Sequence, residues 1–362
     1  MQKYPPTKRI ECKEIMHGKE IEDPYRWLEN EKDPNVEEFI DQQNKYTNKI
    51  LDKELIKNLN KSFGELSNIE SRGPFIPKKG RYFFLKREKN QEHFVLYYRK
   101  GLDGKDIKLI DPNVLSKDGS KALASYNISK DGKILAFWVT ENGSDRMAIN
   151  ILDVDTQKVL EEFIPPSRYN TLAWLDDNSG FYYTKWPEPG KDKDEFCVFF
   201  HKMGTEHAKD IPIFGKDMPS KNHCNVYLSL DNKYLVIIAQ EGWNRNDIFI
   251  KDLKNNSDVK PLVVGKNASF YPTVIGETVY MFTNYKASKL RMVKFDIAHQ
   301  EESHWKEVIP EQDFTLQDWD LVNKRWVLLY LKNAHSVIEV REIEGKPLDE
   351  IKLPELGTIS GM

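Results

Sequence analysis

The chain has 362 residues, of which 31% are charged and 39% hydrophobic, and its formal net charge is −3. This composition is that of a soluble globular protein, and the near balance of charge gives no reason to expect a nucleic acid as partner. The three cysteines, Cys12, Cys197 and Cys224, are too few and odd in number for a disulfide framework. They predict a reducing compartment, the cytoplasm. The longest apolar runs, WVLLYL and YLVIIA, are too short to span a membrane, and we expect no signal peptide.

The first part of the chain has a helical pattern. Residues 1–22 lack a clear period, and we expect them to run as an extended arm. Asp33 followed by Pro34 predicts a helix start, because the carboxylate caps the first turn and proline lacks an N–H that would be unpaired there. Apolar residues then recur at helical spacing and predict one or two amphipathic helices with a stripe that must pack on another surface. These residues are Val36, Phe39, Ile40, Tyr46, Ile50, Leu51, Leu55, Leu59 and Phe63.

After about Gly73 the pattern alternates, and we place a domain boundary between 1–72 and 73–362. Short strands rich in aromatic and β-branched residues follow turns that carry glycine, asparagine or aspartate. One such turn recurs every 44 to 52 residues, and its marker residues are Gly80, Gly132, Gly180, Asn232, Gly276 and Asn323. A period near 50 with several strands in each repeat is typical of a β-propeller. The alternative is a set of unrelated hairpins in a large sandwich, which the near-constant spacing disfavours.

Motifs for catalysis or cofactor binding are absent from the sequence. No G-x-S-x-G elbow occurs, and Ser360, in GTISG, is followed only by two residues. The nucleophile of an α/β-hydrolase precedes its acid and histidine in sequence, so we do not expect Ser360 to be a nucleophile. Other triad orders place the histidine upstream, where His299, His304 and His335 are available. The eight histidines have no spacing typical of a zinc site, and phosphate-binding loops are missing. We therefore expect no metal and no cofactor.

One stretch is more specific. The sequence HGKEIEDPYRWLEN at 17–30, followed by VEEFIDQQNK at 36–45, resembles the amino-terminal signature of the prolyl oligopeptidase family. The segments at 109–137, 172–183 and 228–237 resemble that family's propeller, and the resemblance runs from about residue 4 to the end. The core of the signature is Asp23, Pro24, Tyr25, Trp27, Leu28 and Glu29.

The resemblance implies a seven-bladed propeller that caps an α/β-hydrolase domain. In this family the amino-terminal helices belong to the hydrolase domain, and the catalytic serine, aspartate and histidine all lie after the propeller. The chain thus resembles the helical arm plus about six blades, with no catalytic residue of its own. The implied activity of the whole protein is serine endopeptidase cleavage of short peptides after proline, for which the propeller acts as a size filter.

The resemblance also suggests residues that face the substrate cavity. They are Tyr169, His223, Gln240 and Trp243. Gln240 and Trp243 stand where animal members have an arginine and a cysteine, and His223 stands near a position that often holds methionine. The alternative for all four positions is ordinary packing within the blades.

Two other interpretations of the whole chain remain. It is either a stand-alone propeller that serves as a binding module, or a truncated product without function. In the truncated product, a missing blade would leave open strand edges and the helices would lack a partner surface, and both features predict self-association or poor solubility.

Overall fold

The protein is described by a computed structural model that covers residues 4–30, 32–168, 170–186, 196–216 and 222–359. It forms two compact units. The first consists of Met1–Glu70 with Glu88–Asn90, and the second of Ser71–Arg87 with Gln91–Met362. Within the described ranges, no helix is long and apolar enough to cross a bilayer.

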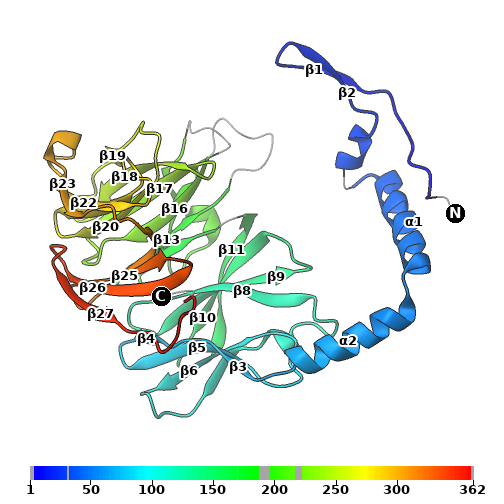
Figure 1. Cartoon of the computed structure of the whole chain (residues 1–362), viewed down its shortest axis with the longest axis horizontal. Helices are drawn as coiled ribbons and strands as arrows, with labels where there is room; N and C mark the ends of the chain where they lie inside the picture. The colour runs from blue at the N-terminus through cyan, green and yellow to red at the C-terminus, as the bar shows by residue number, and fades with distance from the viewer. Residues whose placement is uncertain (1–3, 31, 169, 187–195, 217–221, 360–362) are drawn as a thin grey trace. The chain divides into compact units, whose positions relative to one another are not determined.

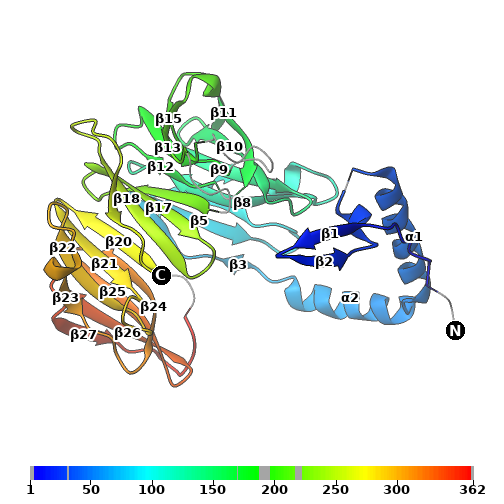
Figure 2. The ribbon, with the colours of Figure 1, turned by 90° about the horizontal axis from the view of Figure 1, so that it is seen from above.

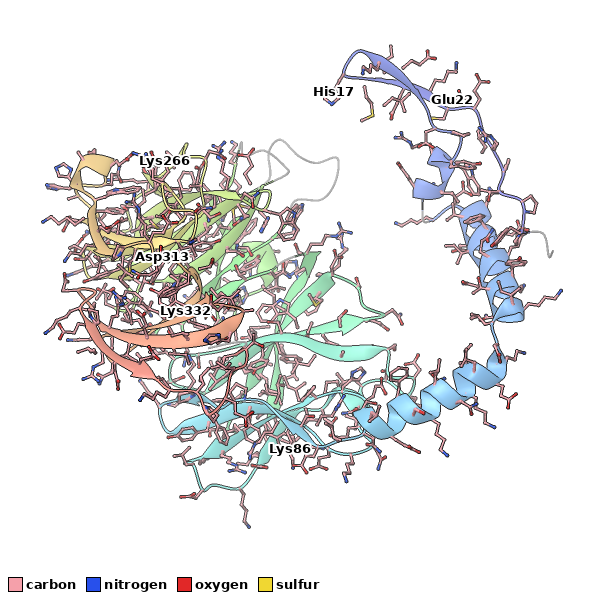
Figure 3. The ribbon with its side chains drawn as sticks, in the orientation of Figure 1. His17, Glu22, Lys86, Lys266, Asp313 and Lys332 are labelled. Atoms are coloured by element: carbon pink, nitrogen blue, oxygen red, sulfur yellow. A yellow bond between two sulfur atoms is a disulfide. The ribbon has the colours of Figure 1, made fainter. Side chains whose placement is uncertain are left out.

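The first unit begins with a hairpin that the sequence pattern did not predict. Its strands are β1 (Lys13–Met16) and β2 (Lys19–Glu22), which pair in antiparallel fashion. The two residues between them, His17 and Gly18, have φ values of 51° and 77°; Figure 3 labels His17 at this tip. Two consecutive left-handed residues make the tight turn that suits the twist of paired strands. The prediction of a purely extended arm is therefore wrong for these residues.

The signature residues connect the parts of this unit. They form the short 3₁₀ helix η1 (Arg26–Glu29). Arg26 forms ion pairs with Asp23 at 2.9 Å and with Glu14 of the hairpin at 2.5 Å. The indole Nε1 of Trp27 donates to the carbonyl oxygen of Lys8 at 2.9 Å, and its ring meets that of Phe39 edge to face at 6.0 Å. The motif thus joins the segment before the hairpin, the hairpin and the first helix.

Two helices follow, as predicted. They are α1 (Pro34–Ile50) and α2 (Lys53–Ser67). The Asp33 carboxylate accepts from the backbone N–H of Asn35 at 2.9 Å, and Asp52 caps α2 in the same way. Val36 is the only buried residue of the two helices in the part of the chain that the structure describes. The rest of the predicted apolar stripe is largely exposed, with Leu55 at 54% and Phe63 at 64%.

The second unit is a six-bladed β-propeller, in agreement with the repeat pattern (Figures 1 and 2). Each blade is an antiparallel sheet made from one continuous stretch of chain. Blade 1 contains β3 (Ser71–Arg72), β4 (Ile76–Lys78), β5 (Arg81–Arg87), β6 (Val95–Lys100) and β7 (Ile107–Ile110). Blade 2 contains β8 (Lys121–Ile128), β9 (Ile134–Glu141), β10 (Arg146–Asp153) and β11 (Lys158–Arg168). Blade 3 contains β12 (Leu172–Trp174), β13 (Gly180–Thr184), β14 (Val198–Lys202) and β15 (Ile211–Phe214).

The last three blades repeat this order. Blade 4 contains β16 (Asn222–Leu228), β17 (Tyr234–Glu241), β18 (Arg245–Asp252) and β19 (Lys260–Val263). Blade 5 contains β20 (Phe270–Ile275), β21 (Thr278–Thr283), β22 (Arg291–Asp296) and β23 (Lys306–Ile309). Blade 6 contains β24 (Thr315–Val322), β25 (Arg325–Lys332), β26 (His335–Glu342) and β27 (Pro347–Ile351). Short 3₁₀ turns occur at η2 (Pro112–Val114), η3 (His207–Lys209) and η4 (Glu302–His304).

Five of the six marker residues lie in the turns that lead into β5, β9, β17, β21 and β25, and Gly180 is the first residue of β13. Five of them have a positive φ, from 48° at Asn323 to 81° at Gly80, which glycine and asparagine adopt at little cost. Gly180 is the exception. Its φ is not positive, but a Cβ there would lie 2.5 Å from the carbonyl oxygen of His201 on the neighbouring strand. In that blade the left-handed position is taken by Asn178, with a φ of 59°.

The core of the propeller lies between its blades. Five clusters of buried apolar side chains fill the five seams between consecutive blades. The seam between blades 2 and 3, for example, contains Trp138, Trp174, Phe181 and Tyr183. A smaller cluster of Phe84, Val95 and Tyr97 belongs to blade 1 alone. Successive side chains of a strand point to opposite faces of its sheet. The two faces of a blade therefore pack against the blade before it and the blade after it.

Candidate functional site

Two of the four candidate substrate residues lie opposite each other in blade 4. His223 on β16 pairs in register with Gln240 on β17. Directly opposed residues of an antiparallel pair share one face of the sheet, so the two side chains are neighbours. The Gln240 side-chain amide donates to the carbonyl oxygen of Gly242 at 3.3 Å. Tyr169, the first candidate, lies outside the described residues.

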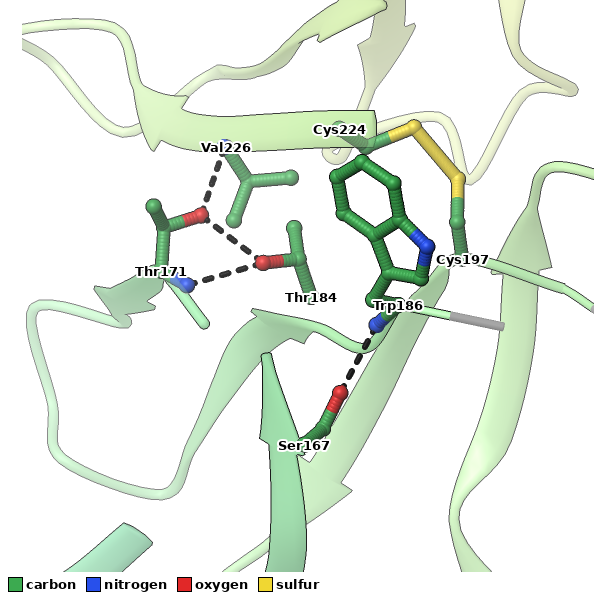
Figure 4. The surroundings of a disulfide bond; sticks show 7 residues. All are labelled: Ser167, Thr171, Thr184, Trp186, Cys197, Cys224 and Val226. Carbon is green, nitrogen blue, oxygen red and sulfur yellow. Dashed lines mark hydrogen bonds between the residues drawn. A yellow bond between two sulfur atoms is a disulfide. The ribbon is translucent and has the colours of Figure 1, made fainter. Parts of the chain in front are cut away.

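His223 is held by an aromatic residue that sequence reasoning missed. The ring of Trp186, just after β13 of blade 3, stacks on the imidazole at a centroid distance of 5.2 Å and an angle of 20°. The backbone N–H of Trp186 donates to Ser167 Oγ at 2.8 Å, as Figure 4 shows. Partial burial lowers the pKa of His223 below its usual value, because desolvation disfavours the charged imidazolium. The pair therefore presents a neutral, stacked imidazole at neutral pH.

Trp243 lies at the tip of the next hairpin. It is 95% exposed, between β17 and β18, and an ion pair of Glu241 with Arg245 at 3.5 Å closes the base of that turn. Gly242 beside it has a φ of 61°. A large aromatic side chain this exposed has apolar surface available for a ligand or a further domain.

A separate cavity lies against the first strands of blades 4, 5 and 6. It has a volume of about 230 Å³, and its lining includes Tyr227 on β16, Val274 on β20 and Trp319 on β24. The Tyr227 hydroxyl donates to the carbonyl oxygen of Pro272 across the seam, and burial raises its pKa well above the usual value. The hydroxyl is therefore a neutral hydrogen-bonding group and is unsuited to act as a base.

The structure contradicts the prediction about cysteines. Cys197 and Cys224 form a disulfide, with their Cα atoms 6.3 Å apart (Figure 4). Cys12 is free. The two partners are 27 residues apart in sequence, and only the packing of blade 3 on blade 4 brings them together. This bond removes the basis on which the sequence predicted a reducing compartment.

The histidines do not form a catalytic site in the described part of the chain. His201 is fully buried, its Nδ1 contacts Asp210 Oδ1 at 2.6 Å, and the Tyr183 hydroxyl donates to Asp210 Oδ2 at 2.8 Å. Such a network orients a histidine, but here substrate has no access to the buried ring. His304 pairs with Glu301 at 3.2 Å on the surface. Among the described residues, no group of three histidine, cysteine or acidic side chains is arranged for a metal ion. Ser360 lies outside the described residues.

A comparison with known protein families shows to which family the chain belongs. Residues 5–362 match the model of the prolyl oligopeptidase N-terminal β-propeller domain. The chain belongs to the prolyl oligopeptidase family. It is 33% identical, over 99% of its length, to the prolyl endopeptidase of Elizabethkingia meningoseptica, and 34% identical to that of Elizabethkingia miricola.

Solved structures agree with this relationship. One from a study of two prolyl endopeptidases superposes with a TM-score of 0.91 at 32% identity, over 98% of this chain and 54% of the other. The peptide-bound prolyl oligopeptidase B from Galerina marginata shares the fold, with a TM-score of 0.80 at 23% identity, over 96% of this chain and 53% of the other. The chain spans about half the length of the curated relatives it matches, 52% for both Elizabethkingia proteins.

Proposed function

We propose that this chain is the arm and propeller of a serine endopeptidase that cleaves short peptides after proline when its α/β-hydrolase domain is present. The observation that carries the proposal is the match of nearly the whole chain to the amino-terminal half of prolyl endopeptidases. In this proposal residues 1–72 belong to the hydrolase domain, and residues 73–362 form the propeller.

The propeller acts as a size filter over the active site. Size exclusion needs stiff walls and no reactive group. The buried apolar clusters between blades supply such walls, since a close-packed interior resists deformation. Short peptides pass to the catalytic serine, whereas folded proteins do not.

The hydrolase domain is the partner for the arm. The exposed stripe on α2, formed by Leu55, Leu59, Phe63 and Leu66, supports this assignment. An amphipathic helix gains stability when its apolar face is buried, at about 25 cal/mol per Å² of apolar surface. An apolar surface on the hydrolase domain supplies that burial.

The chain alone is expected to lack peptidase activity, because the family's three catalytic residues lie in the other half. A fluorogenic peptide that contains proline tests this expectation on the purified chain. We expect no hydrolysis, either before or after Ser360→Ala. Hydrolysis that co-purifies with the chain and is abolished by an active-site serine reagent would contradict the proposal.

A chimera tests the filter and the substrate residues. The propeller of this chain replaces that of the Elizabethkingia meningoseptica prolyl endopeptidase, and kcat/KM is measured for a peptide of about 6 residues and for a folded protein with an exposed proline loop. We expect cleavage of the peptide only. Gln240→Ala and Trp243→Ala should raise KM several-fold with little change in kcat, as loss of substrate binding requires. Equal cleavage of both substrates would contradict the filter, and an unchanged KM would contradict the two residues.

A further inference from the structure

One side chain of blade 2 reaches past blade 3 to blade 4. Lys130, in the turn between β8 and β9, donates to the Asp176 carboxylate of blade 3 at 2.7 Å and to the carbonyl oxygen of Leu230 of blade 4 at 3.3 Å. A lysine ammonium lies about 6 Å from its own Cα, so the turns of three successive blades come within one side-chain length. In a ring of blades this is possible only on the inner side, at the axial channel.

The first strands of the blades line this channel. The side-chain amide of Asn127 on β8 donates to the carbonyl oxygen of Leu172 on β12 at 2.9 Å. The Tyr227 hydroxyl on β16 donates to the carbonyl oxygen of Pro272 on β20. First strands of successive blades thus touch one another, as the innermost strands of a propeller do. The cavity of about 230 Å³ described above lies on this channel, because residues of blades 4, 5 and 6 share it.

Lys130 reaches the rim of that cavity. Leu230, whose carbonyl oxygen accepts from the ammonium, is one of the lining residues, and its side chain is 55% exposed. Its backbone N–H donates to the carbonyl oxygen of Val274 on β20 at 3.2 Å, so the rim continues into blade 5. A cation on a flexible stem therefore lies at one end of the channel. We call this end, formed by Lys130, Asp176 and Leu230, the mouth.

The contacts that hold Lys130 at the mouth are weak and replaceable. The side chains of Lys130 and Asp176 are 51% and 44% exposed, and an ion pair with this exposure contributes little in water. The Asn178 side-chain amide of blade 3 donates to Asp131 Oδ2 of blade 2 at 3.0 Å, and this bond joins the two turns without Lys130. The lysine side chain can therefore leave the mouth while the blades stay in place.

We propose that the Lys130 side chain partly closes the mouth of the axial channel and thereby limits the size of the peptide that passes. This inference rests on the proposed size filter and names the side chain that sets its limit at this end. Asp176 is a positioning residue, because its carboxylate holds the ammonium beside Leu230. Short peptides pass beside the lysine, whereas longer ones enter only when the ion pair is broken.

Thiol labelling of the chain as it stands tests the width of the mouth. Thr273, which lines the cavity, is replaced by cysteine in a Cys12→Ser background, and labelling rates are measured with a small and with a bulky maleimide. The ratio of the two rates cancels any change in the reactivity of the thiol. Lys130→Ala should raise the ratio of bulky to small reagent about fivefold, because access to the thiol limits the bulky reagent.

Two further variants are matched controls for the labelling. Lys130→Arg keeps a long cation at the mouth and should leave the ratio as it was. Lys133→Ala removes a lysine from the same turn and should also leave it unchanged. A ratio that does not respond to Lys130→Ala, or that responds equally to Lys133→Ala, would overturn the proposal.

The chimera described above tests the consequence for cleavage. Its kcat/KM is measured for peptides of about 6 and about 20 residues, each with one internal proline. Lys130→Ala and Asp176→Asn should raise kcat/KM for the longer peptide about threefold and leave that for the shorter one unchanged. Equal changes for both peptides, or none, would overturn the proposal. Failure of the unmodified chimera to cleave the shorter peptide would instead contradict the proposed function, and the labelling ratio then decides the role of Lys130.

Discussion

Gly345 has a φ of +85°, and a Cβ placed there would lie 2.0 Å from the carbonyl oxygen of Val308 on the preceding blade. Gly276 also has a positive φ, +57°, but nothing lies within 4 Å of its Cβ position. The left-handed backbone costs a non-glycine residue about 1 kcal/mol, and a clash with a backbone atom adds a further 1–3 kcal/mol, roughly. Gly345→Ala should therefore lower the free energy of unfolding by about 3 kcal/mol and Gly276→Ala by about 1 kcal/mol. Urea denaturation of the two variants measures this; equal losses would exclude the close approach of the blades.

Glu302 contacts two lysines and a tyrosine hydroxyl beside blade 5. Its carboxylate contacts Lys266 Nζ at 2.8 Å and Lys286 Nζ at 2.6 Å and accepts from the Tyr285 hydroxyl. The bonds from Lys266 and Lys286 lower the pKa of Glu302 from 4.5 to about 2. Figure 3 labels Lys266, in the connection between β19 and β20.

The sign of the pH dependence follows from that shift. A carboxyl group with a lower pKa in the folded state stabilises the fold above pH 4.5, and this contribution is lost as the pH falls toward 2. Glu302→Gln should lower the urea midpoint at pH 6, and its difference from the unmodified chain should shrink between pH 4.5 and pH 3. Glu307→Gln, on the same blade and paired with Arg291, is the control. A difference that does not depend on pH would contradict the assignment.

At the scale of elements, helix α2 presents an apolar stripe to solvent. Phe63 and Leu59 are 64% and 43% exposed in this chain. Burial of such surface between copies drives association, so Phe63→Glu should reduce concentration-dependent self-association while the helix content remains unchanged. Ser62→Glu adds the same charge beside the stripe and should leave association as it was. Light scattering coupled to gel filtration, with circular dichroism, measures both. Self-association that persists in Phe63→Glu would show that another surface mediates it.

The sequence predicted the elements best where local chemistry determines them. The cap at Asp33 and the marker turns at Gly132 and Asn232 depend on neighbouring residues only, and both predictions are confirmed. The β1–β2 hairpin was missed because its strands have four residues each and lack a clear alternation. The stacking of Trp186 on His223, 37 positions apart, and the bond between Cys197 and Cys224 depend on how two blades pack, which no local pattern shows. Whether His223, Gln240 and Trp243 contact substrate stays a prediction.

The whole molecule consists of two units with their own interactions. Because the helices bury only Val36 among the described residues, the first unit should unfold at a lower temperature than the propeller. Calorimetry should show two transitions, and removal of residues 1–70 should abolish the first and leave the second within a few degrees. A single transition that disappears with the arm would mean that the two units fold as one.

The blades follow one another in the chain without exchange of strands. A ribosome therefore delivers each sheet complete before the next begins, and every new blade finds the face of its predecessor already formed. Cys197 emerges before its partner's strand has been made, so its thiol must stay reduced until β16 follows. Cys12 is already present at that stage, so a wrong bond between Cys12 and Cys197 forms most easily while positions 197 to 224 are being translated.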